Sequence, residues 1–151
     1  MADNRKVCVD ASVVLKLVIS ENDSEKVEKL WADWISNKVE ITAPFLLALE
    51  TGSVLRNRVW RKEITQEEGE TAFEITQSLK IAFLNPDFLY KTAWGLAKQF
   101  NLPTIYDSCY LALAQILEAP FWTADRKLYH AVGNKLKWVK WLEDYKEFSM
   151  D

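Results

Sequence analysis

The sequence is poor in the residues on which several common catalytic sites depend. It contains one histidine, His130, and two cysteines, Cys8 and Cys109, among 151 residues. A histidine zinc site, a two-histidine ribonuclease site and a serine–histidine–aspartate triad with a spare ligand are therefore hard to build. The sequence also has no glycine-rich phosphate loop and no Cys-x-x-Cys pair. We interpret His130 as a surface or partly packed residue rather than a catalyst.

Long apolar runs and an excess of positive charge are also missing. No apolar stretch approaches the roughly 18 residues of a membrane span, and the polar start of the chain does not resemble a signal peptide. The two cysteines lie inside apolar segments, which is typical of core residues in a reducing compartment. We therefore expect a soluble, cytoplasmic protein. A net charge of −3 means that any nucleic-acid binding must use a local basic patch.

Short apolar runs alternate with amphipathic helical patterns along the chain. The predicted strands are residues 7–9, 40–43, 81–84, 121–123 and 136–139. The predicted helices are residues 11–19, 24–35, 45–60, 66–79, 86–100, 107–117 and 124–132. We expect Asp23 or Ser24 to cap the second helix and Thr65 with Glu68 to form a capping box. Such alternation predicts an α/β fold, a three-layer sandwich whose central, mostly parallel sheet of four to five short strands is flanked by helices.

No linker, repeat or low-complexity segment interrupts this alternation. A chain of 151 residues is a common size for one domain with one core. We therefore predict a single domain over residues 1–151, with frayed ends at about residues 1–5 and 143–151.

Four acidic residues do not fit ordinary solvated helix faces. Asp10 follows the first strand, and Asp125 follows the fourth by one residue. Asp107 begins a helix, and Glu50 shares a helix face with apolar neighbours. Capping of the following helix is the alternative explanation for Asp10, Asp107 and Asp125. For Glu50 the alternatives are a buried salt bridge or a position at the edge of the apolar stripe.

Three of these acids share a position at the carboxyl side of the predicted sheet, where ligands collect in open α/β folds. Carboxylates held close together repel, so a cation or bound protons must accompany them. Oxygen ligands favour Mg²⁺ or Mn²⁺ over zinc. A site of this kind suits phosphodiester hydrolysis by metal-activated water.

The acidic residues lie in motifs that resemble those of PIN-domain proteins, and specifically VapC-type toxins of toxin–antitoxin pairs. The motifs are Val-Asp-Ala-Ser around Asp10, Leu-Ala-Leu-Glu ending at Glu50, Tyr-Asp-Ser-Cys around Asp107 and Thr-Ala-Asp-Arg around Asp125. The resemblance covers residues 7 to about 141. One departure is Ser108, where such proteins often have alanine.

The resemblance implies a Mg²⁺- or Mn²⁺-dependent endoribonuclease, usually a homodimer, that a small antitoxin neutralises by blocking the active site. The four acids match the family's metal site, and Ser12 and Thr123 match the hydroxyls that support it. Binding of RNA near these acids requires local basic residues. The candidates are Lys16, Arg56, Arg58, Arg61, Arg126 and Lys127. Phosphate contacts of this sort position a backbone without reading its sequence.

Two other functions remain open at this point. The fold could serve as a non-catalytic interaction module in which the acids are helix caps. A different Mg²⁺-dependent phosphate enzyme is the other alternative. Haloacid-dehalogenase-like phosphatases need Asp-x-Asp after the first strand, where this chain has Ser12, and receiver domains need an early acidic pair, where Asp10 stands alone.

Overall fold

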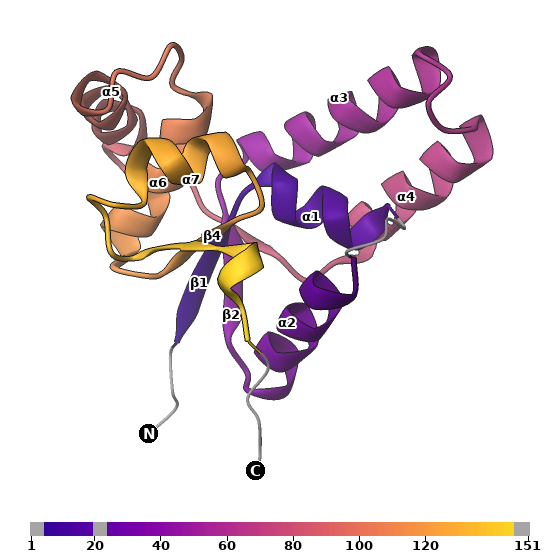
Figure 1. Cartoon of the computed structure of the whole chain (residues 1–151), viewed down its shortest axis with the longest axis horizontal. Coiled ribbons are helices and arrows are strands. Elements are labelled where there is room, and N and C mark those ends of the chain that lie inside the picture. Colours follow the sequence, from indigo (N-terminus) through magenta and orange to yellow (C-terminus); the bar gives the residue numbers. More distant parts are fainter. Residues whose placement is uncertain (1–4, 20–23, 147–151) are drawn as a thin grey trace.

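The computed structural model describes residues 5–19 and 24–146, and within them the chain forms one parallel sheet covered by helices (Figure 1). The elements in chain order are β1 (Lys6–Val9), α1 (Ala11–Val18), α2 (Ser24–Ser36), β2 (Glu40–Ala43), α3 (Leu46–Trp60), α4 (Gln66–Ser78), β3 (Ala82–Phe83), α5 (Leu89–Gln99), α6 (Tyr106–Leu117), β4 (Phe121–Thr123), α7 (Arg126–Val132), β5 (Val139–Trp141) and the 3₁₀ helix η1 (Leu142–Asp144). The α/β prediction is confirmed.

The strand order places the first strand at the centre of the sheet. The order is β3-β2-β1-β4-β5, and every pairing is parallel. The chain moves one way from β1 to β3 and then crosses back to β4, so helices α1–α4 cover one face and α5–α7 the other (Figure 1). The connections that leave the carboxyl ends of the neighbouring strands β1 and β4 therefore run to opposite faces of the sheet, at the kind of position where ligands bind in open α/β folds.

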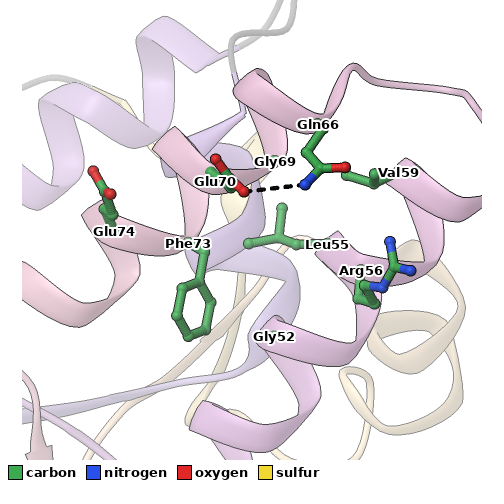
Figure 2. Close-up of a pocket in the computed structure, with 9 residues that line it drawn as sticks. All are labelled: Gly52, Leu55, Arg56, Val59, Gln66, Gly69, Glu70, Phe73 and Glu74. Carbon is green, nitrogen blue, oxygen red and sulfur yellow. Dashed lines mark hydrogen bonds between the residues drawn. The ribbon is translucent and has the colours of Figure 1, made fainter.

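A projecting helical hairpin is formed by α3 and α4 (Figure 1). The predicted capping box at its turn is confirmed, because the Thr65 hydroxyl accepts from the Glu68 amide and the Glu68 carboxylate accepts from the Thr65 amide. Figure 2 shows the groove between the helices, a pocket of about 420 Å³ lined by both of them. The helices approach closely at Gly69, which is buried.

Replacing Gly69 with alanine should destabilise the hairpin. A Cβ atom at this position would lie 2.3 Å from Val59 Cγ2, and the branched Val59 side chain has little freedom to move away. We expect Gly69→Ala to lower the free energy of unfolding by about 1–2 kcal/mol, as overpacking does. The measurement is urea denaturation at equilibrium.

The matched control is Gly95→Ala. Gly95 lies inside α5, and a Cβ atom there would meet nothing within 4 Å. Alanine should therefore leave stability unchanged or raise it by up to about 1 kcal/mol through helix propensity. A Gly69→Ala protein as stable as the Gly95→Ala protein would contradict the close approach of α3 and α4.

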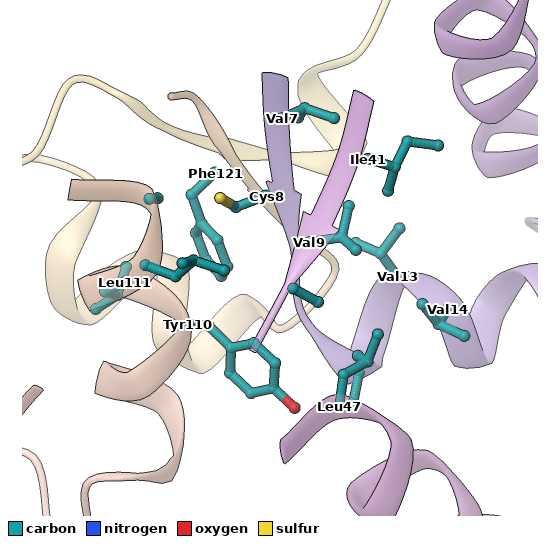
Figure 3. Close-up of a cluster of buried hydrophobic side chains, with 14 of the residues drawn as sticks. Val7, Cys8, Val9, Val13, Val14, Ile41, Leu47, Tyr110, Leu111 and Phe121 are labelled. Atoms are coloured by element: carbon teal, nitrogen blue, oxygen red, sulfur yellow. The ribbon is translucent and has the colours of Figure 1, made fainter. Parts of the chain in front are cut away.

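The core lies on both faces of β1. Val7, Cys8 and Val9 are at most 2% exposed, and they pack among side chains of the neighbouring strands and helices (Figure 3). Burial raises the pKa of the Cys8 thiol to about 11, and both cysteines are free thiols. The expectation of reduced core cysteines therefore agrees with their placement.

Several predicted boundaries differ from the structure. The last strand begins at Val139, not at Leu136, because residues 136–138 lie in turns that follow α7 and Val139 is the first residue to pair with β4. The predicted Asp23 cap lies outside the described residues. So do the expected frayed ends at residues 1–4 and 147–151, whereas Glu143 contacts Lys26 through its carbonyl oxygen at 2.9 Å.

None of the described helices is both long and apolar enough to cross a membrane.

Candidate metal and active site

Asp10 is held rigidly at the carboxyl end of β1. Its side chain is buried, with 4% of the residue exposed. Ser12 Oγ donates to Oδ1 at 2.5 Å, Thr123 Oγ1 donates to Oδ2 at 2.6 Å, and the Val13 amide donates to Oδ1 at 3.3 Å. A carboxylate oxygen accepts about two hydrogen bonds, so Oδ2 keeps one acceptor position for a ligand.

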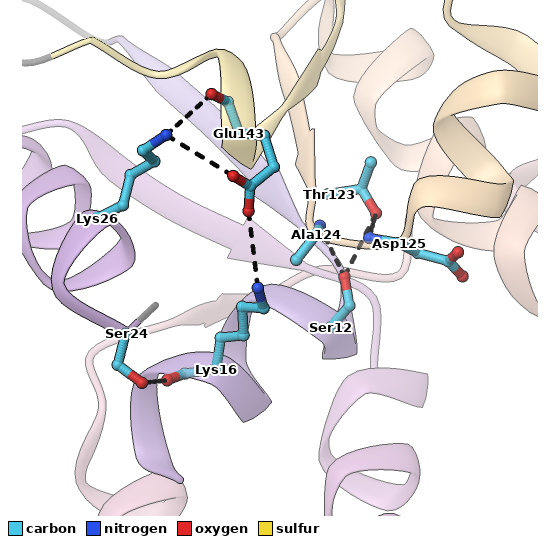
Figure 4. Close-up of polar contacts among 8 residues, drawn as sticks. All are labelled: Ser12, Lys16, Ser24, Lys26, Thr123, Ala124, Asp125 and Glu143. Carbon is cyan, nitrogen blue, oxygen red and sulfur yellow. Dashed lines mark hydrogen bonds and ion pairs between the residues drawn. The ribbon is translucent and has the colours of Figure 1, made fainter. Parts of the chain in front are cut away.

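Two hydroxyl groups, those of Ser12 and Thr123, connect the start of α1 to the segment between β4 and α7 (Figure 4). Ser12 Oγ accepts from the Ala124 amide at 2.8 Å, and Thr123 Oγ1 accepts from the Asp125 amide at 3.0 Å. Each hydroxyl has one proton, and each donates it to Asp10. The β1–α1 and β4–α7 segments are therefore fixed to each other through the two hydroxyls that we predicted to support the site.

Helix capping explains part of the acid positions but not all of them. Asp10 caps α1, and Asp125 caps α7 by accepting from the Leu128 amide at 3.2 Å. Asp107 does not cap α6, because the cap position is Ile105 and it makes no side-chain capping bond. The capping alternative is thus wrong for Asp107, which is half-buried within the first turn of α6.

Glu50 lies in the second turn of α3 and is half-buried. The alternative of a buried salt bridge is not found, because no ion pair of Glu50 occurs among residues 5–19 and 24–146. Burial raises the pKa of Glu50, the hydroxyl of Tyr110 lowers it, and the Asp107 charge raises it further. An acid without a cationic partner on this helix face still needs an explanation.

The four acids interact electrostatically, with Asp107 between the others. Burial raises the pKa of Asp10 to about 7, and the Asp107 charge adds to this effect. The pKa of Asp107 is itself raised by burial and by Asp125, and is lowered by Lys127. Together with the effect of Asp107 on Glu50, these shifts couple Asp107 in turn to each of the other three acids.

The four carboxylates do not form a complete set of metal ligands in the structure. In the part of the chain that the structure describes, no three Asp, Glu, His or Cys side chains are arranged to hold a metal ion. Repulsion between like charges favours such spacing. The expectation that the four acids form one metal site therefore stays a prediction.

Sequence reasoning missed Tyr110, which is fully buried on α6. Its hydroxyl oxygen has no hydrogen-bond partner among the described residues, and neither does the buried hydroxyl of Ser108. The available signal was a tyrosine three residues after Asp107, a spacing that puts two side chains on neighbouring parts of a helix surface. An aromatic residue in an apolar stripe usually indicates core packing, so the pattern gave no sign that the Tyr110 hydroxyl has a separate role.

The predicted cations fall into two groups. Arg126 and Lys127 begin α7 beside the acids: Lys127 lowers the pKa of Asp107, and Arg126 Nε donates to His130 Nε2 at 3.4 Å. Lys16 instead forms an ion pair with Glu143 at 3.8 Å (Figure 4). Local cations near the acids are thus provided by the start of α7.

The other predicted cations lie farther along α3 and beyond it. With a helix rise of 1.5 Å per residue, Arg56 is displaced about 9 Å from Glu50 along the axis, and Arg61 about 16 Å. Arg56 lines the α3–α4 groove (Figure 2), and Arg58 is half-buried near the end of α3. These arginines extend away from the acids rather than surrounding them.

The fold and the site together define a class of protein. It is an α/β protein with a parallel sheet in which Asp10 follows β1 and Asp125 caps the helix after β4, and in which the charge of Asp107 affects the pKa of Asp10 and Glu50. Such a donor set is typical of a hard divalent cation site.

The chain belongs to the PIN domain family, whose model matches residues 7–134. It is 32% identical over 127 residues to "Ribonuclease VapC1" of Mycobacterium tuberculosis, which spans 83% of this chain and 90% of that protein. Its fold is similar to that of PAE2754 from Pyrobaculum aerophilum, with a TM-score of 0.66, 20% identity and 93% of each chain covered. A chain in a toxin–antitoxin complex from Klebsiella pneumoniae is also similar, with a TM-score of 0.59, 14% identity, and 93% of this chain and 99% of that chain covered.

Proposed function

We propose that this protein is a divalent-metal-dependent endoribonuclease and the toxin of a type II toxin–antitoxin pair. Membership of the PIN domain family and the similarity to a relative named as a ribonuclease support this proposal. The observation that carries it is the buried carboxylate of Asp10, which Ser12 and Thr123 hold at the carboxyl end of β1 and whose pKa the nearby Asp107 charge helps to raise.

The residues present fit a hard divalent cation. All of the donors are oxygens, the pKa values of Asp10, Glu50 and Asp107 are raised, and a buried tyrosine hydroxyl beside them has no hydrogen-bond partner among the described residues. Asp10, Glu50, Asp107 and Asp125 would hold Mg²⁺ or Mn²⁺. Such an ion supplies Lewis acidity that activates water and stabilises the leaving oxygen of a phosphodiester.

The protein's own groups have separate roles in this proposal. Ser12 and Thr123 fix the orientation of Asp10, so that its remaining acceptor position on Oδ2 faces the ligand. Lys127 and Arg126 reduce the repulsion between the acidic site and the phosphates of RNA. Contacts between such cations and phosphates also orient the RNA strand. Lys16, Arg56, Arg58 and Arg61 would contact RNA only at a distance from the acids.

Protein partners are part of the same proposal. We propose a homodimer and a small antitoxin that covers the active site. Large apolar side chains are exposed on the α3–α4 hairpin, including Leu49 at 72% and Trp60 at 71%. Exposed apolar groups gathered in this way are typical of protein-binding surfaces.

The test is cleavage of a structured RNA by the purified protein with Mg²⁺, with Mn²⁺ and with EDTA. We expect cleavage with either metal, its loss in EDTA and its recovery when excess metal is returned. Cleavage that persists in chelator would contradict metal dependence. If the protein neither cleaves RNA nor binds Mn²⁺ in calorimetry, it would instead be a non-catalytic interaction module. That alternative is favoured by one observation: no three acidic side chains among the described residues are arranged to hold a metal ion.

A further inference from the structure

Tyr110 carries a polar group that packing alone does not require. The residue is 0% exposed and is the largest of the fully buried side chains. A phenylalanine would fill the same space without bringing a hydroxyl into the core. A buried hydroxyl that lacks a partner is costly, so the oxygen of Tyr110 calls for a functional explanation.

The hydroxyl of Tyr110 faces the acidic edge. Figure 3 shows the ring directing its oxygen away from the strands and toward the start of α3, where Leu47 lies. Glu50 follows Leu47 by three residues on this helix. The hydroxyl lowers the pKa of Glu50, while burial first, and then the charges of Glu50 and Asp10, raise that of Tyr110.

The Tyr110 oxygen has no hydrogen-bond partner of ordinary geometry among the described residues, although each of the two side chains shifts the pKa of the other. Glu50 is only half-buried, so its carboxylate has room to rotate. Tyr110 comes from α6 and Glu50 from α3, and these helices cover opposite faces of the sheet (Figure 1). The buried Tyr110 hydroxyl is therefore a fixed hydrogen-bond donor that can orient the less buried Glu50 carboxylate.

We propose that Tyr110 is a positioning residue, which donates a hydrogen bond to the Glu50 carboxylate and thereby orients it toward the divalent cation held with Asp10 and Asp107. The metal part of this inference rests on the proposed function. Groups that orient a metal ligand from behind commonly change metal affinity by 10- to 100-fold when they are removed.

The test uses Tyr110→Phe, which removes one oxygen and keeps the ring. Tyr106→Phe is the matched control, because Tyr106 is on the same helix turn as Asp107 but is 59% exposed. We expect the Mn²⁺ dissociation constant, measured by calorimetry, to rise about tenfold or more in Tyr110→Phe and to stay within twofold in Tyr106→Phe. Unchanged affinity in Tyr110→Phe would overturn the positioning role while leaving the proposed function intact.

A second measurement needs no metal. Urea unfolding in EDTA of the wild type, Tyr110→Phe, Glu50→Ala and the double variant forms a double-mutant cycle, because alanine leaves no acceptor for the Tyr110 hydroxyl. A contact between the two side chains predicts that the shifts in unfolding midpoint are not additive, and additive shifts would overturn the proposal. If the wild type binds no Mn²⁺, the proposed function fails, and the cycle alone then decides whether Tyr110 and Glu50 interact.

Discussion

Asp107→Asn should lower RNA cleavage by about a thousandfold or more at saturating metal. The substitution keeps the shape of the side chain but removes the charge that couples to the other three acids. A metal ion acting as a Lewis acid contributes several kcal/mol to a transition state, and about 4 kcal/mol corresponds to a thousandfold in rate. The measurement is single-turnover cleavage of a labelled RNA.

The variant should remain folded, because Asp107 does not cap α6 and its replacement removes repulsion rather than a capping bond. Glu28→Gln is the matched control, since Glu28 is an exposed acid on the outer face of α2. It should cleave RNA as the wild type does. If Asp107→Asn retained more than about a tenth of the wild-type rate, Asp107 would not be at the centre of the site.

Without metal, Asp10→Asn should stabilise the protein at pH 8 by a few kcal/mol, with the difference closing toward pH 4. Burial raises the pKa of Asp10 from 3.8 to about 7. Between these two pH values the folded state binds a proton that the unfolded state has lost, so the wild type loses stability as pH rises. Each unit of pKa corresponds to about 1.4 kcal/mol, which sets an upper bound of about 4 kcal/mol.

Chemical denaturation in EDTA at several pH values between 4 and 8 measures this difference. Asparagine keeps an acceptor for the Val13 amide, so the cap of α1 survives the substitution. Glu28→Gln should again track the wild type at every pH. Two results would show that the Asp10 carboxyl is not desolvated: a difference in the free energy of unfolding between wild type and Asp10→Asn that does not change with pH, or a wild type more stable than Asp10→Asn at pH 8.

The sequence allowed much of the fold to be predicted because local patterns and tertiary structure agree. The run at residues 7–9 is buried on both faces and reads as a central strand, and Thr65 with Glu68 is a local signal that needs no tertiary contact. The last strand was misplaced because Leu136 and Trp138 are apolar but lie in turns. Only the pairing of Val139 with Phe121, a long-range contact, sets the start of β5.

The site was predictable as residue types but not as geometry. The acids could be picked out because each was followed by a helix or lay on an apolar face. Their coupling depends on strand order, which no local pattern contains: Asp10 and Thr123 meet because β1 pairs with β4. Tyr110 and the ion pair of Lys16 with Glu143 were missed for the same reason, since each contact joins distant parts of the chain.

We propose above that Asp107 and the carboxylates coupled to it bind a divalent metal ion together. Diffraction from crystals grown with Mn²⁺, recorded where manganese scatters anomalously, tests it most directly. We expect an anomalous peak bonded to carboxylate oxygens of Asp10 and Asp107, and none there in crystals of Asp107→Asn. Peaks confined to exposed acids elsewhere, with this edge of the sheet empty at saturating Mn²⁺, would contradict it.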